Sequence, residues 1–224
     1  MLRIYYSSIE PYKVKDLIEV FGSKLSNHTL YKTHNYKTED DKKRCILGEL
    51  LLHYSVKRIL GYKNHELEIY QEKYGKPYVK DNIVYFNISH SGEYVMCAIS
   101  SKELGIDIEK HIEITENIFR FFHEKERDYL NKVGKINRFF FDLWTQKESY
   151  IKYLGTGLNT PLDSFYIANG KNGASVYDNY GRRDKVYLQS LSIDKSYSCT
   201  VCSEVKEVTC LTKIYKKDLN HLNQ

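Results

Sequence analysis

The segment Leu104–Lys110 reads LGIDIEK, and its alternation of apolar and polar positions predicts a β-strand. In such a strand the three aliphatic side chains face one way, whereas Gly105, Asp107 and Glu109 face the other. Two carboxylates then lie side by side, where their repulsion favours a bound cation or a raised pKa for one of them. A solvated acidic face on an edge strand fits the same residues, and for an isolated pair of this kind it is the commoner outcome.

The length and charge of the chain narrow the class of protein. With 224 residues it can form one large domain or two small domains that share a core. No apolar run approaches the roughly 18 residues of a membrane span, and the first residues lack the apolar stretch of a signal peptide, so we expect a cytoplasmic protein that does not enter a membrane. The formal net charge of +5 suits an anionic partner, which can be a phosphorylated small molecule, a nucleic acid or an acidic protein.

The five cysteines give no disulfide framework, because their number is odd and their spacing is irregular. Cys199 and Cys202 form a C-x-x-C pair inside an alternating segment, 197–203, that predicts a strand, and no second close pair completes a zinc site. A redox pair is expected at the start of a helix, so we interpret both residues as buried strand cysteines.

Helical patterns alternate with groups of strands along the chain. The strongest helical pattern in the first half covers 39–60, where Thr38 and Asp41 form a capping pair and Gly61 lies just past the end. We expect helices at 11–26, 39–60, 116–133 and 137–154, and strands at 2–7, 65–70, 83–88, 94–100, 104–110, 163–168, 174–178, 186–193, 197–203 and 211–215.

The connecting segments divide this pattern into two similar α/β halves that join near residues 101–103, because each half runs from a helix into antiparallel strands. We expect a tight loop at 89–93 and a turn at 169–173. The tail after Lys216 is polar and is expected to fray.

Three further segments carry groups that suit an anionic ligand. Arg44 lies one helical turn from Gly48, so the arginine can reach an anion while the glycine permits close approach. The segment 89–93 offers two hydroxyls, an imidazole and a glycine, which suits phosphate recognition. Glu148 and Lys152 stand at positions i and i+4 of one helix. Each segment also has a simpler interpretation when it is taken singly. Arg44 can be a solvated surface residue, 89–93 can be an ordinary hairpin, and Glu148 with Lys152 can be a surface salt bridge.

The order of the segments is more specific than any one of them. The series is RCILGE at 44–49, YGKP at 74–77, FNISHS at 86–91, GIDIE at 105–109, WTQKESYIK at 144–152, GTGL at 155–158 and PLDSF at 161–165. It resembles the 4'-phosphopantetheinyl transferases of the surfactin-synthetase-activating type, densely over residues 40–168 and loosely over the remainder. The acidic strand and the W-x-x-K-E-S-x-x-K helix would rarely coincide by chance.

This resemblance implies a magnesium-dependent enzyme that moves the 4'-phosphopantetheine arm of coenzyme A onto a serine of an apo acyl or peptidyl carrier protein and releases adenosine 3',5'-bisphosphate. It implies an α/β (α+β) fold of two subdomains related by a pseudo-twofold, each a small antiparallel-rich sheet packed with a long helix, in a monomer with coenzyme A between the halves. We assign residues 1–102 to the half that contacts the adenosine and 3'-phosphate, and residues 103–224 to the half with the magnesium ligands and catalytic carboxylates. The carrier can serve nonribosomal peptide, polyketide or fatty acid synthesis.

Position by position, the resemblance places Asp107, Glu109 and Glu148 on Mg²⁺, which prefers oxygen ligands. It makes Glu148 the candidate general base, directly or through water, and Lys152 the group that stabilises charge on the pyrophosphate. Glu148, Lys152 and Asp107 form the expected catalytic set. The expected contacts to coenzyme A are Arg44 and His90 at the 3'-phosphate, Ser89 nearby, Lys76 at the adenosine end, Lys152 at the pyrophosphate and, less directly, Lys147. Gly105, beside Asp107, leaves room for a ligand to approach the backbone.

One departure from the family pattern lies ahead of the Arg44 helix, where two spaced basic residues are usual and this chain reads NHTLYK at 27–32. His28 and Lys32 are the candidates to replace them. The segment 112–127 is the expected docking surface for the carrier, because Ile118, Phe119, Phe121 and Phe122 lie among charges there. Core packing is expected for at least half of these aromatic residues.

Two other functions fit part of the pattern. A magnesium-dependent nuclease or phosphodiesterase also uses a D-x-E strand, a glutamate and a lysine, but the lysines here are spread along the chain and form no basic stripe. We therefore expect no nucleic-acid partner. A non-catalytic carrier-binding protein is disfavoured because all four acidic and basic residues of the expected catalytic centre are present.

Overall fold

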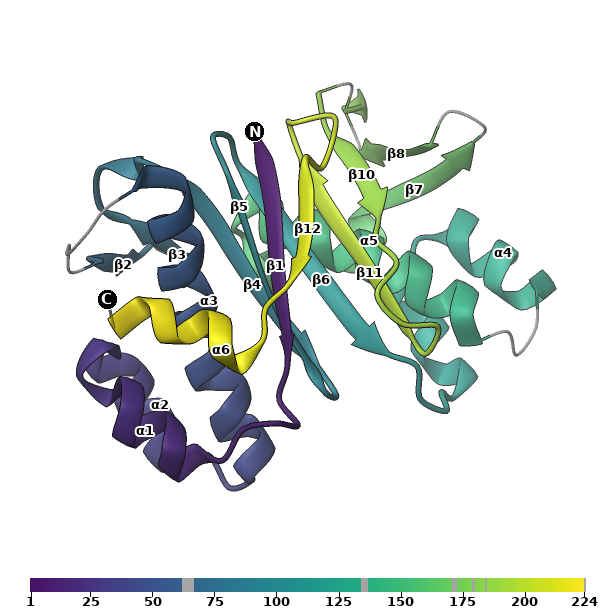
Figure 1. The fold of residues 1–224 in the computed structure, drawn as a ribbon. Helices are drawn as coiled ribbons and strands as arrows, with labels where there is room; N and C mark the ends of the chain where they lie inside the picture. Colours follow the sequence, from purple (N-terminus) through teal and green to yellow (C-terminus); the bar gives the residue numbers. More distant parts are fainter. Residues whose placement is uncertain (62–66, 134–136, 171–172, 179, 184, 224) are drawn as a thin grey trace.

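The computed structural model describes residues 1–61, 67–133, 137–170, 173–178, 180–183 and 185–223. Its first half contains a four-stranded sheet of order β12-β1-β5-β4, in which β12 runs parallel to β1 and the other neighbours are antiparallel (Figure 1). The helix α3 packs on β4 and β5. The elements of this half are β1 (Leu2–Ser8), α1 (Val14–Phe21), α2 (Asn27–Asn35), α3 (Glu39–Leu60), β2 (Ile69–Gln71), β3 (Pro77–Val79), β4 (Tyr85–Ser91), β5 (Tyr94–Ser100) and, from the end of the chain, β12 (Cys210–Lys213) and α6 (Lys216–Leu219).

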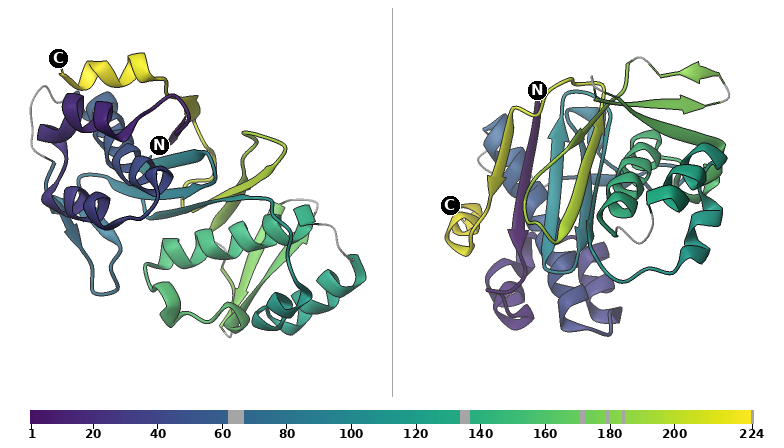
Figure 2. Two further views of the ribbon diagram at one scale, coloured as in Figure 1. Left: turned by 90° about the horizontal axis from the view of Figure 1, so that it is seen from below. Right: turned by 90° about the vertical axis from the view of Figure 1, so that its right-hand side faces the viewer.

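The second half contains a larger sheet of order β6-β11-β10-β8-β7, with the short β9 beside β8. The helix α5 lies against β6 and β11, and α4 contacts β7. Figure 2 shows the two groups of helices on opposite sides of the paired sheets. The elements are β6 (Leu104–Lys110), α4 (Glu124–Val133), α5 (Asn137–Leu154), β7 (Phe165–Gly170), β8 (Gly173–Asp178), β9 (Gly181–Arg182), β10 (Tyr187–Ser190) and β11 (Tyr197–Ser203).

Three apolar clusters hold these layers together. One lies between α3 and the first sheet, and a second lies between α5 and the second sheet. The third is shared by both sheets: Leu2 and Ile4 of β1 join Ile106 and Ile108 of β6 in it, and all four side chains are fully buried. The alternation of the acidic strand is therefore confirmed, and its aliphatic face forms the centre of the molecule.

Several predicted elements are confirmed with their caps. The helix 39–60 spans the residues expected; the Thr38 side chain accepts a hydrogen bond from the Asp41 N–H, and Gly61 ends the helix in the left-handed conformation. Strands 94–100 and 197–203 and helix 137–154 also have the predicted bounds. Cys199 and Cys202 are buried free thiols on β11, as interpreted from the sequence.

Other expectations were wrong in detail. The segment 11–26 is not one helix: α1 ends at Phe21, and α2 begins after Ser26, whose side chain caps it. The helix expected at 116–133 is interrupted at Phe122, which is extended and fully buried, so a short 3-10 helix (η3, Glu116–Phe121) precedes α4. The expected strand 65–70 begins only at Ile69, and residues 62–66 lie outside the described residues.

The segments expected to be loops, turns or a frayed tail also differ from expectation. The loop expected at 89–93 is only a turn at Gly92 and Glu93, because Ser89, His90 and Ser91 belong to β4. The tail after Lys216 forms α6 and a final 3-10 turn, since Leu219 and Leu222 are buried in the first cluster. Of the turn expected at 169–173, Asn169 and Gly170 belong to β7 and Gly173 begins β8, while residues 171–172 lie outside the described part. No helix in the described ranges is long and apolar enough to cross a membrane.

Candidate active site

The acidic face of β6 lies directly beneath α5. A Cβ atom on Gly105 would overlap the backbone carbonyl oxygen of Ser149 and the backbone nitrogen of Tyr153. The room that the sequence predicted for a ligand at Gly105 is therefore occupied by helix backbone, and that prediction was wrong. The close approach instead brings the side chains of α5 within reach of Asp107.

Asp107 is almost completely buried and is held from both halves of the chain. Its Oδ1 atom accepts hydrogen bonds from the Lys152 ammonium at 2.6 Å and from the Ser89 hydroxyl at 3.0 Å. Lys152 also donates to Ser89 Oγ at 3.0 Å. The other oxygen of Asp107, Oδ2, is buried and has no hydrogen-bond partner among the described residues. A buried carboxylate oxygen without a partner is costly, so this position is suited to an additional cation or donor.

Two further carboxylates lie near Asp107. Glu109 accepts a hydrogen bond from the Ser91 hydroxyl at 2.8 Å. Burial raises the pKa of Glu109, and the charge of Asp107 raises it further. Burial likewise raises the pKa of Glu148, again with Asp107 as the second cause. The charge of Asp107 thus disfavours the charged form of both glutamates, which is the condition that a bound cation relieves.

These groups line one cavity of about 270 Å³ at the junction of β4, β6 and α5. Ser89 and His90 of β4 form one side, and the carboxylates with Lys152 form the other. The structure therefore brings together six of the residues singled out from the sequence. The described residues that line it are Ile88, Ser89, His90, Asp107, Glu109, Trp144, Glu148 and Lys152.

Basic groups surround the His90 side of the cavity. Arg44 of α3 donates to the Gly92 carbonyl oxygen and to Asp41 Oδ1, both at 2.6 Å. Desolvation by the surrounding protein lowers the pKa of His90, and the charges of Arg44 and Lys152 lower it further. The His90 side chain is nevertheless exposed, so solvent screens part of this effect. The space beside His90 therefore favours an anion, which would pair with Arg44 and Lys152.

Two predicted lysines do not line the cavity. The Lys76 ammonium donates to Glu103 Oε2 at 2.8 Å and to the carbonyl oxygens of Tyr153 and Leu104, so it fastens the end of α5 to the start of β6. Lys147 is fully buried and pairs with Glu126 of α4 at 2.6 Å. Burial lowers the pKa of Lys147 to about 8, although Glu126 opposes that shift.

His28 lies on the first turn of α2 and is exposed, as is Lys32 one turn further on. Sequence reasoning missed Trp144 and Ile88 as lining residues, and it missed the role of Ser91 beside Glu109. The signal for Ser91 was present in the sequence: Asn87, Ser89 and Ser91 alternate along β4 and so share one face.

The donor set fits Mg²⁺, because carboxylate oxygens are the ligands that it prefers and Asp107 Oδ2 has no protein partner in the described structure. Among the described residues, no group of three or more His, Cys, Asp or Glu side chains is already close enough to hold a metal ion. In this arrangement Lys152 supplies the positive charge next to Asp107.

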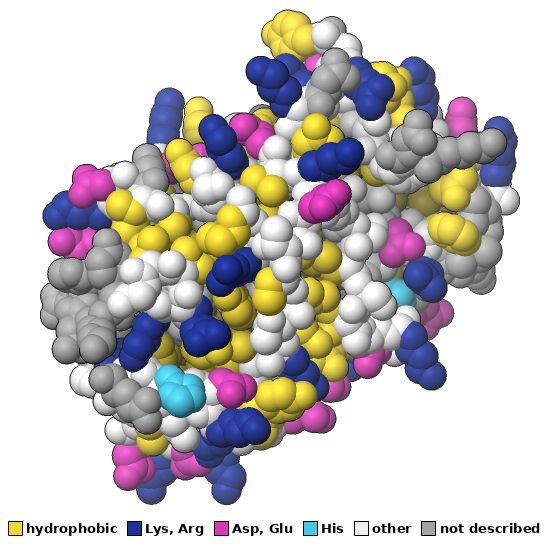
Figure 3. Space-filling model, turned by 45° about the horizontal axis from the view of Figure 1, so that its top comes forward, with side chains coloured by type: hydrophobic (Ala, Val, Ile, Leu, Met, Phe, Trp, Pro, Cys, Tyr) yellow, Lys and Arg dark blue, Asp and Glu magenta, His cyan; other side chains and the backbone are white. Residues whose placement is uncertain are grey.

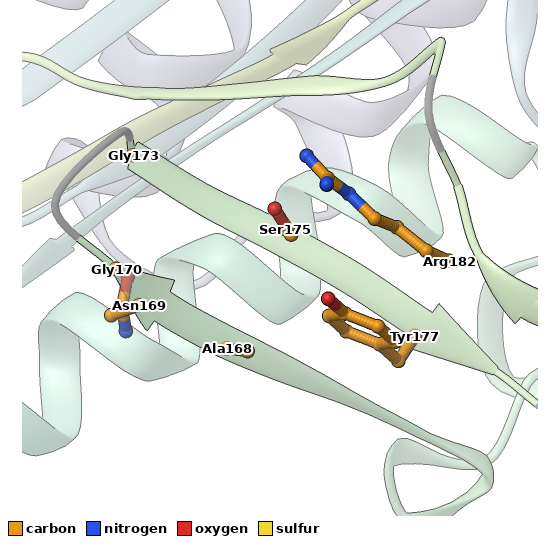
Figure 4. A pocket seen from close by; sticks show the side chains of 7 residues that line it. All are labelled: Ala168, Asn169, Gly170, Gly173, Ser175, Tyr177 and Arg182. Atoms are coloured by element: carbon orange, nitrogen blue, oxygen red, sulfur yellow. The ribbon is translucent and has the colours of Figure 1, made fainter.

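A second cavity, of about 240 Å³, lies on the hairpin of β7 and β8 beside β9 (Figure 4). Figure 4 shows Ser175 and Arg182 on the same side of the hairpin. None of the site residues predicted from the sequence lines it. The lining is Ala168, Asn169, Gly170, Gly173, Ser175, Tyr177 and Arg182.

Comparison with known proteins places this site in a family. Residues 103–202 match the model of the 4'-phosphopantetheinyl transferase superfamily, and residues 14–102 match that of the 4'-phosphopantetheinyl transferase N-terminal region. The chain is 38% identical over 213 residues to the 4'-phosphopantetheinyl transferase gsp of Aneurinibacillus migulanus, covering 93% of this chain and 89% of the relative. It is 33% identical over 189 residues to the 4'-phosphopantetheinyl transferase Sfp of Bacillus subtilis, covering 83% and 84%.

The chain therefore belongs to the 4'-phosphopantetheinyl transferase family, as the order of its motifs indicated. A further relative, psf-1 of Bacillus pumilus, carries the same printed name and is 31% identical over 167 residues, which cover 73% of this chain and 72% of the relative. The mixed α/β architecture, with antiparallel-rich sheets and a long helix on each, agrees with this family. None of these relatives is named as a nuclease, so the alternative left open by the sequence gains no support.

Proposed function

We propose that this protein transfers the 4'-phosphopantetheine arm of coenzyme A to a serine of an apo acyl or peptidyl carrier protein and releases adenosine 3',5'-bisphosphate. The observation that carries the proposal is the shared cavity. Anion-binding groups of β4 and acid–base groups of β6 and α5 line the same space of about 270 Å³. Family membership supports coenzyme A and a carrier protein as the two substrates.

The transfer needs a positioned nucleophile and neutralised charge on the pyrophosphate. The serine Oγ of the carrier attacks the β-phosphorus, the bond from that phosphorus to the bridging oxygen breaks, and the nucleotide leaves. Glu148 takes the hydroxyl proton, directly or through water. Its raised pKa suits this role, because a more basic carboxylate accepts a proton more readily. Lys152 is fixed by Asp107 and Ser89 and stabilises the charge that develops on the phosphate oxygens.

Asp107, Glu109 and Glu148 are the proposed ligands of Mg²⁺. When bound, the ion would neutralise negative charge on the pyrophosphate and lower the repulsion among the three carboxylates. Two observations support this set: the unpartnered Oδ2 of Asp107 in the described structure, and the raised pKa values of the two glutamates.

The half formed by residues 1–102 is proposed to hold the adenosine end of coenzyme A. Arg44 and His90 are the proposed contacts to the 3'-phosphate, with Ser89 beside them and His28 on the neighbouring helix α2. Lys76 would then contribute through the segment around it, since its ammonium already donates to three oxygens. Residues 103–224 supply the carboxylates, although the end of this segment, β12 and α6, packs on the first half.

The carrier is proposed to dock on the segment 112–127. Phe121 and Ile112 are more than half exposed there, whereas Phe119 and Phe122 are buried in the cluster beneath α5. The exposed pair offers apolar contacts for a partner helix. Core packing takes the other two aromatics, in agreement with the expectation from the sequence.

We further propose that the enzyme acts as a cytoplasmic monomer that binds neither nucleic acid nor membranes. On the face shown in Figure 3, lysine and arginine side chains are scattered among acidic and apolar ones instead of gathering in a stripe. Size-exclusion chromatography with light scattering tests the monomer, and a gel-shift assay with duplex DNA tests the exclusion of nucleic acid.

The decisive experiment combines the protein with coenzyme A, Mg²⁺ and a purified apo carrier, and follows the intact mass of the carrier. One added phosphopantetheine group on the carrier serine is the expected result, and no addition to any of several carriers would refute the proposal. Glu148→Gln should lower the transfer rate by about 10²–10⁴-fold while coenzyme A still binds. Glu19→Gln, at an exposed position on α1, is the matched control and should transfer at the rate of the unchanged protein.

A further inference from the structure

Three polar side chains of β4 replace a backbone ladder between the two halves. β4 is the edge strand of the first sheet and β6 is the edge strand of the second. Asn87 Oδ1 accepts a hydrogen bond from the Ile106 N–H at 2.9 Å, Ser89 Oγ accepts one from the Ile108 N–H at 3.3 Å, and Ser91 Oγ accepts one from the Lys110 N–H at 3.0 Å. Every second residue of β4 therefore satisfies every second N–H of β6.

The two serines make a second bond that Asn87 does not make. Ser89 donates to Asp107 and Ser91 donates to Glu109, each to the residue just before the one whose N–H it accepts. At the matching place beside Asn87 stands Gly105, which has no side chain. The repeated geometry thus reaches a carboxylate at two of its three positions.

The direction of these bonds is fixed by the chemistry of the hydroxyl group. A hydroxyl has one proton to donate, and the backbone N–H of β6 must be the donor in its own bond. The proton of Ser91 is therefore available to Glu109, and that of Ser89 to Asp107. Lys152 reinforces the direction of the bond from Ser89 to Asp107, because its ammonium also donates to Ser89 Oγ at 3.0 Å.

We propose that Ser91 and Ser89 are positioning residues that orient Glu109 and Asp107 as metal ligands, so that the first half of the chain completes a metal site whose ligands all belong to the second half. This inference rests on the proposed function, because it concerns the same magnesium site. Each serine bonds one carboxylate oxygen, and for Asp107 the opposite oxygen, Oδ2, is left without a protein partner in the described structure. Outer groups that orient metal ligands in this way commonly change metal affinity by 10–100-fold when removed.

The test measures metal binding directly. Mn²⁺ serves as the probe, and its dissociation constant for the protein is measured by the loss of the free-ion paramagnetic resonance signal. Ser91→Ala should weaken Mn²⁺ binding about 10-fold and raise the Mg²⁺ concentration for half-maximal transfer by a similar factor. Coenzyme A binding without metal should stay within about twofold, since Ser91 does not line the cavity.

Asn87 provides the matched control. Asn87→Ala removes the same kind of bond between the strands. Because Asn87 bonds no carboxylate among the described residues, this variant should lower the thermal midpoint and leave Mn²⁺ affinity unchanged. If Asn87→Ala fails to fold, Asn87→Ser serves as the control instead. Ser91→Thr keeps the hydroxyl and should restore most of the Mn²⁺ affinity that Ser91→Ala loses.

Three outcomes contradict the inference: unchanged Mn²⁺ affinity in Ser91→Ala, an equal loss in the Asn87 variant, or no recovery in Ser91→Thr. The proposed function fails separately, if the unchanged protein transfers no phosphopantetheine to any carrier. Transfer by the unchanged protein with normal metal affinity in Ser91→Ala would therefore refute the positioning role and leave the function intact.

Discussion

The two long helices rest on their sheets in different ways. A Cβ atom on Gly48 of α3 would lie 3.2 Å from a methyl group of Ile88, so α3 is separated from its sheet by side chains. On Gly105 of β6, a Cβ atom would overlap the backbone of α5 itself. One helix is therefore spaced by packing that can adjust, and the other lies against bare strand backbone.

This difference follows the placement of function. The α5 backbone lies close to β6, and Lys152 of the same helix lies 2.6 Å from Asp107. Arg44 of α3 instead contacts a turn, at the Gly92 carbonyl oxygen. We infer that the acid–base side of the cavity needs a fixed helix, whereas the anion-binding side tolerates a helix that can adjust.

The largest expected effect separates the two glycines. Gly105→Ala should destabilise the protein by about 4 kcal/mol or more, or prevent folding, because a methyl group cannot enter a backbone contact. Gly48→Ala should change stability by no more than about 1 kcal/mol, since Ile88 can shift and alanine favours the helix. Urea unfolding of both variants measures the difference, and equal losses would remove the contrast between the helices.

The next effect concerns how each helix is anchored by a buried charge. Lys147→Met should cost about 3 kcal/mol of unfolding free energy, because Glu126 would stay buried without its partner. Glu49→Gln on α3 should cost less, since the amide can still accept from the Ser26 N–H. Calorimetric or urea unfolding compares them. The double variant Lys147→Met with Glu126→Gln should recover part of the lost stability, because it leaves no buried charge without a partner. If stability does not recover, the loss in Lys147→Met does not come from the unpaired charge of Glu126.

A smaller effect tests the hydrogen bonds by which Lys76 fastens the end of α5 to the start of β6. Lys76→Met removes three hydrogen bonds that join the first half to Tyr153, Leu104 and Glu103, and it should lower stability by about 1–2 kcal/mol. Lys73→Met, a nearby exposed lysine, is the control. Coenzyme A affinity is measured in parallel: a large loss of affinity with unchanged stability would instead make the Lys76 ammonium a ligand contact.

The smallest effect concerns the charge of His90. Because its pKa is lowered below the usual 6.5, the ring is mainly neutral at pH 7 and gains its charge as the pH falls. If it contacts a phosphate, the affinity for coenzyme A should rise a few-fold more steeply between about pH 7.5 and 6 in the unchanged protein than in His90→Gln. Titration calorimetry measures both slopes. Protonation of the ligand affects both proteins equally, so parallel slopes would exclude His90 from the contact.

Local patterns gave much of the architecture correctly. The helices 39–60 and 137–154 were predictable because their apolar stripes lie within the helix itself, and the caps of helix 39–60 lie directly beside it. The acidic strand was predictable because its alternation has a period of two. Predictions failed where a distant contact decides: Phe122 interrupts a helix because it is buried, and Leu219 orders the tail because it joins the first core.

The family, the acidic strand and the order of the cavity-lining groups depend on residue types at fixed spacing, so they could be predicted from the sequence. The partner of each lysine, by contrast, follows from the packing of elements that are distant in the sequence. Lys152 pairs with Asp107, Lys147 with Glu126 and Lys76 with the end of α5, and three lysines of the same chemistry thereby acquire three roles. Gly105 likewise changed from a place for a ligand to the contact with α5. Such assignments depend on distances between elements, and no local spacing fixes those distances.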